Sequence, residues 1–101
     1  MKTVKTKESA TNLDATTVMK ALSETNRVNI LKQLQTGRKC VCELVENQSL
    51  SQNLISHHLK ILREAGVVTS YKEGVWTYYE IAGKTIDNLI NALEEMKVSH
   101  E

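Results

Sequence analysis

Residues 51–65 divide their side chains into two faces when they are wound as an α-helix, at about 100° per residue. The apolar arc gathers Leu54, Ile55, His58, Leu59, Ile61, Leu62 and Ala65. The opposite arc gathers Gln52, Asn53, Ser56, His57, Lys60, Arg63 and Glu64. Ser51 is a suitable N-cap and Gly66 a suitable stop. We therefore expect an amphipathic helix that packs against a core along one side.

Three further helices are predicted before this one. Loose apolar spacing indicates the first over residues 12–22, and a second begins after a cap at Ser23 and ends at Gly37. A short third helix is expected over residues 41–47. Only residues 48–50 separate it from the helix over 51–65, which is typical of a helix-turn-helix.

After Gly66 the apolar period changes from helix to strand. Residues 67–72 and 75–81 are rich in β-branched and aromatic residues, and Glu73-Gly74 between them predicts a hairpin turn. Helical spacing returns over residues 84–97. The expected fold is mainly α with a small β-hairpin: a winged helix-turn-helix of four helices, two strands and a final helix.

Composition sets the size of the core. A chain of 101 residues with 41% hydrophobic content closes one modest core, so we expect one domain, over residues 12–98, that gains from a partner subunit. Residues 1–11 are expected to form a flexible basic arm with Lys2, Lys5 and Lys7. No apolar run suits a membrane span or a signal segment, so we expect a cytoplasmic protein without a membrane partner.

The polar arc of the helix over 51–65 offers the side chains that read bases in a major groove. Gln52 and Asn53 suit pairing with adenine, and Ser56 and His57 lie further along the same face. Lys60 and Arg63 suit phosphates, and Lys72 on the predicted hairpin adds positive charge. The formal net charge is only +1, so the prediction rests on where these charges lie. The alternative is a merely solvated polar face, and His58, on the apolar arc, is expected to be a hydrogen-bonded core histidine.

Residues 21–27 (ALSETNR) leading into Ile30-Leu31, and residues 51–68 (SQNLISHHLKILREAGVV), resemble the ArsR/SmtB family of metal-sensing repressors. The resemblance covers residues 15–97. It implies a homodimer, joined through the first and last helices, on double-stranded operator DNA with two-fold symmetry. It also implies that the base-reading residues are Gln52, Asn53, Ser56 and His57, and that DNA binding requires no cofactor.

Cys40 and Cys42 form a possible thiol pair at the start of the third helix. Residues two apart point about 200° from each other within a helix, but they can approach at its first turn, where Cys40 takes the cap position with Glu43 three residues on. The helix end, Arg38 and Lys39 would favour thiolates there. A disulfide is not expected, because the spacing closes a small ring and the compartment is reducing.

Thiolates prefer soft ions, so arsenite, antimonite, cadmium and lead are the expected inducers. The pair also resembles the Cys-Val-Cys element of the arsenic, cadmium and lead sensors in that family, which usually have a third sulfur. Val45 stands at one position for that sulfur, so a small thiol, a water, Glu43 or Glu46 are the alternatives. The zinc site that other members have in the final helix is discounted, since only Asp87 and His100 are present.

The predicted function is a DNA-binding repressor that releases its operator when a soft ion binds Cys40 and Cys42. One alternative is a redox or reactive-sulfur sensor that uses the same cysteines. Another is a protein-interaction module on a winged-helix scaffold that does not bind DNA. The cysteines could also be small buried hydrophobes. No nucleophile–base pair or phosphate loop indicates an enzyme.

Overall fold

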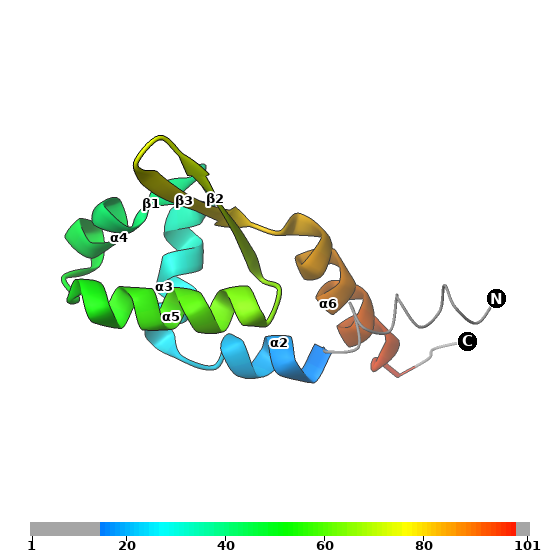
Figure 1. The fold of residues 1–101 in the computed structure, drawn as a ribbon. Coiled ribbons are helices and arrows are strands. Elements are labelled where there is room, and N and C mark those ends of the chain that lie inside the picture. Colours follow the sequence, from blue (N-terminus) through cyan, green and yellow to red (C-terminus); the bar gives the residue numbers. More distant parts are fainter. Residues whose placement is uncertain (1–14, 99–101) are drawn as a thin grey trace.

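The computed structural model describes residues 15–98, and Figure 1 shows their arrangement. The helices are α2 (Ala15–Ala21), α3 (Thr25–Leu34), α4 (Val41–Gln48), α5 (Gln52–Glu64) and α6 (Gly83–Glu95). The strands are β1 (Lys39–Cys40), β2 (Val68–Glu73) and β3 (Trp76–Ile81). This order confirms the winged helix-turn-helix class, with α4 and α5 as the helix-turn-helix and the β2–β3 hairpin as the wing. The predicted arm over residues 1–11 and the start of the first helix lie outside the described residues.

The core forms around one side of α5. Ile55, Leu59 and Leu62 are at most 1% exposed, and they join Ile30 of α3 and Leu44 of α4 in one cluster. Burying a side chain of this size contributes about 1.5–3 kcal/mol. None of the helices within residues 15–98 is long and apolar enough to cross a membrane.

Burial along α5 follows the predicted arcs with one exception. Every member of the polar arc is exposed, while Ile61 and Ala65 are half-buried. Leu54, which was expected to be buried, is 48% exposed. On the helical wheel it lies about 90° from the mean direction of the four buried residues, Ile55, His58, Leu59 and Leu62. The apolar face is therefore narrower at the start of α5 than the helical wheel predicts.

The wing belongs to a sheet of three strands in the order β1-β3-β2, all antiparallel. The pairing of Glu73 with Trp76 places the turn at Gly74-Val75, so the predicted Glu73-Gly74 turn is wrong by one residue. Gly74 takes a φ of 67°, which glycine adopts without steric cost at the first position of a two-residue hairpin turn. The third strand, β1, was not predicted. It joins the start of α4 to the wing.

The cap of α3 also differs from the prediction. Glu24 is the N-cap, and its carboxylate accepts a hydrogen bond of 3.2 Å from the backbone N–H of Arg27. Ser23 instead donates its hydroxyl to the carbonyl of Lys20, at 2.7 Å. The Ser23 side chain is therefore used at the end of α2, and the next polar residue caps α3.

Candidate DNA-reading helix and cysteine pair

The first turn of α5 is fixed by a serine cap. Ser51 has an extended backbone, and its hydroxyl accepts a hydrogen bond of 3.1 Å from the N–H of Leu54. This satisfies one of the free donors at the start of the helix. Gln52 and Asn53 follow directly and are exposed. The cap thus holds the two predicted adenine-pairing residues on an ordered first turn.

The other predicted DNA contacts lie on the same exposed side of α5 or on the wing. Ser56, His57, Lys60 and Arg63 are all exposed. Lys72 is exposed on β2, opposite Thr77 of β3. We call the six predicted contacts on α5 the exposed arc: Gln52, Asn53, Ser56, His57, Lys60 and Arg63. This surface combines amide, hydroxyl, imidazole and cationic groups, which suits base edges along its length and phosphates at its basic end.

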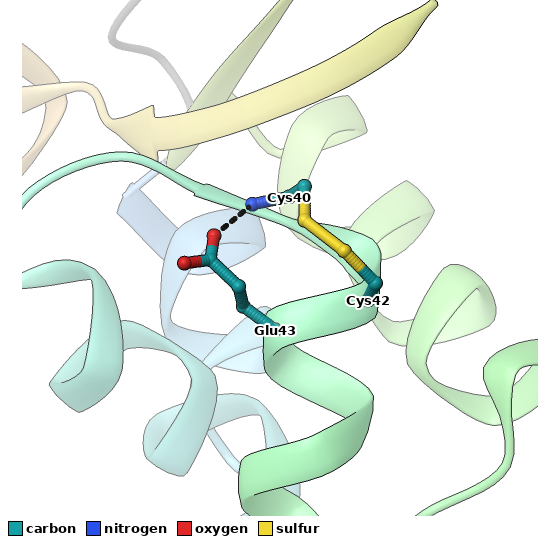
Figure 2. Close-up of a disulfide and its surroundings, with 3 residues drawn as sticks. All are labelled: Cys40, Cys42 and Glu43. Carbon is teal, nitrogen blue, oxygen red and sulfur yellow. Dashed lines mark hydrogen bonds between the residues drawn. A yellow bond between two sulfur atoms is a disulfide. The ribbon is translucent and has the colours of Figure 1, made fainter.

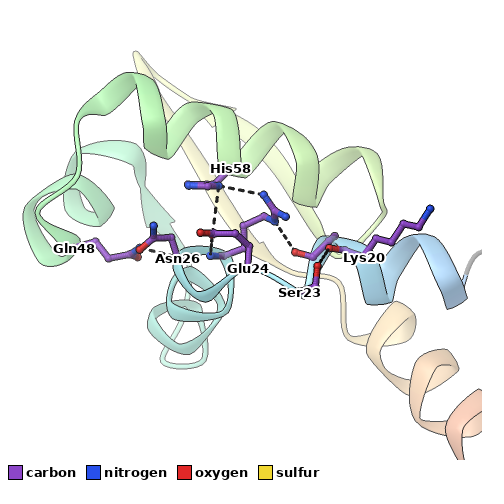
Figure 3. Close-up of polar contacts among 8 residues, drawn as sticks. Lys20, Ser23, Glu24, Asn26, Gln48 and His58 are labelled. Atoms are coloured by element: carbon purple, nitrogen blue, oxygen red, sulfur yellow. Dashed lines mark hydrogen bonds and ion pairs between the residues drawn. The ribbon is translucent and has the colours of Figure 1, made fainter.

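His58 joins the opposite side of α5 to the first turn of α3 and, through Arg27, to the end of α2. It is 8% exposed and lies across from Glu24 (Figure 3). Its Nδ1 lies 3.3 Å from the guanidinium of Arg27. The guanidinium has only donors, so Nδ1 accepts and carries no proton. Arg27 in turn donates from Nε to the carbonyl of Ala21 at 2.6 Å. The prediction of a hydrogen-bonded core histidine is confirmed.

The charge state of His58 follows from the same surroundings. Burial lowers the pKa of His58 below its ordinary value. The carboxylate of Glu24, 3.9 Å from Nδ1, opposes this shift, while Arg27 and His57 lower the pKa further. His58 is therefore a neutral anchor for α5 near pH 7.

Cys40 and Cys42 meet at the junction of β1 and α4 (Figure 2). Cys40 ends β1 and is the N-cap of α4 with an extended backbone, while Cys42 lies in the first turn. Cys40 is 7% exposed and Cys42 is exposed. The backbone N–H of Cys40 donates to the carboxylate of Glu43 at 2.9 Å, as expected for residues at a capped helix start.

The two sulfurs are joined in a disulfide, so the prediction against a bridge is wrong. The extended backbone at Cys40 sets the two Cα atoms 5.4 Å apart, within the range of about 4.4–6.8 Å that disulfides usually span. The ring closes because Cys40 is extended and only Cys42 is helical, which turns the two side chains toward each other (Figure 2). The prediction that the sulfurs can approach at the helix start is confirmed.

Residues 15–98 contain no group of three or more His, Cys, Asp or Glu side chains that could hold a metal ion. Glu43, one candidate for a third ligand, holds the backbone of Cys40 instead. After reduction, Cys40 and Cys42 supply two soft sulfur ligands, which suit a thiophilic ion. Any further ligand of that ion would come from outside this pair.

Arg38, which was predicted to favour thiolates at the cysteines, makes its side-chain contacts with the wing. Its guanidinium forms an ion pair with Glu73 at 2.7 Å and a hydrogen bond with the Tyr71 hydroxyl at 2.8 Å. It also lies over the ring of Tyr78, 4.0 Å from the centroid. The bonds to Tyr71 and Glu73 raise the pKa of Arg38 above its ordinary value. Its charge therefore holds the wing, next to the β1–β3 pairing in which Cys40 lies opposite Tyr78.

A cavity of about 340 Å³ lies beside the cysteines, and no sequence pattern indicated it. It is lined by Cys40, Val41, Cys42, Gln52, Trp76 and Thr77. The cavity thus brings together the disulfide, the first residue of α5 and the wing near its turn. These segments are distant in sequence, and only the folding of β3 against β1 and of α5 against α4 brings them to one place.

Comparisons with known proteins agree with this architecture. The family model described as "Bacterial regulatory protein, arsR family" matches residues 24–70. An uncharacterized HTH-type transcriptional regulator of Methanocaldococcus jannaschii is 37% identical over 83 residues, 81% of this chain and 93% of that protein. The arsenical resistance operon repressor of Bacillus subtilis is 37% identical over 73 residues, 71% of this chain and 70% of that protein. A solved structure of an ArsR-like transcriptional regulator from Rhodococcus sp. RHA1 matches with a TM-score of 0.78 and 28% identity, covering 86% of this chain and 82% of that one.

Proposed function

The chain belongs to the arsR family of bacterial regulatory proteins, and we propose that it is a repressor whose operator affinity is set by Cys40 and Cys42. Members of this family are DNA-binding transcriptional regulators rather than enzymes. The observation that carries the proposal is the exposed arc of α5, which faces away from a core that holds the same helix firmly on its other side.

In the proposed complex α5 enters a major groove. Gln52, Asn53, Ser56 and His57 contact base edges, while Lys60 and Arg63 contact phosphates. Lys72 contacts the backbone from the wing. The amide side chains at the capped first turn give sequence preference, and the lysine and arginine give affinity that depends on salt.

The DNA-bound form is proposed to be a homodimer joined through α2 and α6. Apolar side chains of α6 and of its C-cap are exposed in the single chain: Ile90 is 47%, Leu93 44% and the C-cap Met96 65% exposed. A partner subunit would cover this stripe, which is costly to leave in water. Two copies of α5 would then face successive grooves of a two-fold operator.

The inducer is proposed to be a thiophilic ion: arsenite, antimonite, cadmium or lead. The similarity to an arsenical resistance operon repressor favours arsenite or antimonite. The two thiolates of the reduced pair bind the ion at the first turn of α4. Cys40 belongs to both β1 and the cap of α4, so a change in its position acts on the wing and on the helix before α5. A coupling of about 1–3 kcal/mol lowers operator affinity at least fivefold.

Operator release is the experiment that tests this proposal. A duplex selected by the protein from a random pool is labelled, and its anisotropy is followed while arsenite, antimonite, cadmium or lead is added to the reduced protein without oxygen. Release at micromolar ion is expected, and magnesium should have no effect. Cys40→Ser and Cys42→Ser should each bind the operator normally and lose release. Release that persists in both variants would overturn the role of the pair.

The disulfide favours a second candidate, a redox sensor on the same scaffold. In this case two thiols lose two protons and two electrons to an oxidant and form the bridge. Adding diamide, whose azo group accepts both, to the reduced complex without any metal ion distinguishes the two. Release by diamide, with none by the ions, would assign the switch to oxidation.

A further inference from the structure

We propose that the cavity beside Cys40 and Cys42 binds the organic group of a monosubstituted trivalent arsenical, R–As(OH)₂, whose arsenic is held by both sulfurs. The inference rests on the proposed function, because it requires that the reduced pair binds arsenic. It names the class of arsenical that this chain should prefer.

The number of sulfur donors favours a substituted arsenical. Trivalent arsenic forms three bonds, and within residues 15–98 no third cysteine, histidine or carboxylate joins the two sulfurs in a group that could hold an ion. Inorganic arsenite therefore keeps a hydroxide or needs a thiol from elsewhere. An arsenical that already carries one carbon substituent is satisfied by two sulfurs.

The binding reaction balances without a change of oxidation state at arsenic. Each cysteine S–H loses its proton to one hydroxide of R–As(OH)₂, two As–S bonds replace two As–O bonds, and two waters leave. The disulfide must first be reduced. A phosphine does this with one water, becoming a phosphine oxide while both thiols gain a proton.

The cavity has the size and walls for an aromatic substituent. Its volume is about 340 Å³, whereas an engineered cavity of about 150 Å³ holds benzene. Trp76 is 52% exposed and lines the cavity together with Val41 and Thr77. An indole ring beside the sulfurs offers a phenyl group a stacking or edge-on partner.

An organic group bound in the cavity would also contact α5 directly. Gln52 lines the same cavity as the two cysteines, and it is the first residue of α5. An organic group bound there lies against a side chain proposed to read a base. The structure therefore offers a direct route from the arsenical to α5, in addition to the backbone route through α4.

Equilibrium dialysis tests the inference without DNA. The full chain is reduced with a phosphine, the excess is removed without oxygen, and bound arsenic is counted by elemental mass spectrometry. Arsenite, methylarsonous acid and phenylarsonous acid are compared, with dithiothreitol as the reference for intrinsic dithiol affinity. The ratio of phenyl to methyl affinity for the protein is divided by the same ratio for dithiothreitol. We expect the phenyl compound to bind about tenfold more tightly than the methyl compound after this correction. Trp76 is the sole tryptophan of the chain, so the phenyl compound should also change its fluorescence.

Two neighbouring substitutions provide the matched comparison. Trp76→Ala removes one wall of the cavity and should abolish the preference for phenyl over methyl. Val75→Ala, at an 88% exposed residue that does not line the cavity, should keep it. Equal binding of phenyl and methyl compounds by the unchanged chain would overturn the cavity while leaving thiol sensing intact. If no arsenical binds at all, both this inference and arsenic as the inducer are wrong.

Discussion

Replacing Lys60 with alanine tests whether the exposed arc of α5 lies along the phosphate backbone. Lys60 is exposed and follows Gln52 by eight residues, about 12 Å along the helix axis. With the start of α5 at the bases, this side chain should reach a phosphate. The substitution removes one positive charge and leaves the buried side of α5 unchanged.

The expected change is a smaller dependence of affinity on salt. Each neutralised phosphate contributes about 0.9 to the slope of log affinity against log salt, so two protomers on a two-fold operator lose about 1.8. A fourfold increase in salt, from about 50 to 200 mM, should then weaken the unchanged protein roughly 12-fold more than Lys60→Ala.

Fluorescence anisotropy with a labelled operator and a scrambled duplex measures this slope for both DNAs. Lys60→Ala should lower it on both, because phosphate contacts carry no sequence information. Lys32→Ala is the matched control, since Lys32 is an exposed lysine of α3 that lines a hollow with residues of α6. An unchanged slope for Lys60→Ala, or an equal change for Lys32→Ala, would refute the placement of α5.

Three further predictions concern the base contacts, the histidine anchor and the cap. Gln52→Ala combined with His57→Ala should bring operator affinity close to the affinity for scrambled DNA, since a good base contact is worth about 1–3 kcal/mol. The slope of log affinity against log salt should change little. If the double variant retains full operator affinity, the interaction-module alternative is favoured. The lowered pKa of His58 means that the folded state favours the neutral imidazole. Its contribution to folding stability is therefore complete above the ordinary pKa of 6.5 and declines as the pH falls below that value. Urea unfolding between pH 7.5 and 5 should show this decline, and His58→Gln should make the decline smaller. Ser51→Ala should cost about 1 kcal/mol in urea unfolding and Ser51→Thr much less, and equal losses would contradict the cap.

The helix α5 could be predicted well because the pattern that defines it lies within the helix itself and the residue before it. Thirteen consecutive residues repeat with the period of a helix, and a serine precedes them, so both the buried and the exposed side could be read from spacing. The burial of His58 followed from the same wheel, although it lies beside an exposed histidine. Leu54 was misplaced because the width of a buried face depends on the neighbouring helices, which the wheel does not contain.

Other features depend on contacts between distant segments. A strand of two residues, β1, shows no pattern of its own and exists because Lys39 and Cys40 pair with β3. The same pairing draws Arg38 to the wing, where Glu73 and the tyrosines hold it. The disulfide was not predicted, because it depends on the extended backbone that Cys40 takes where it pairs with β3. The cavity required the packing of α4, α5 and β3 together.

The most direct test of the central claim, that ion binding at Cys40 and Cys42 controls DNA binding by α5, is a measurement of linkage. Arsenite affinity of the reduced protein is determined with and without saturating operator, and operator affinity with and without saturating arsenite. If the two sites are coupled, both affinities must fall by the same factor, at least fivefold. Equal arsenite affinity for the free and the operator-bound protein would contradict this coupling.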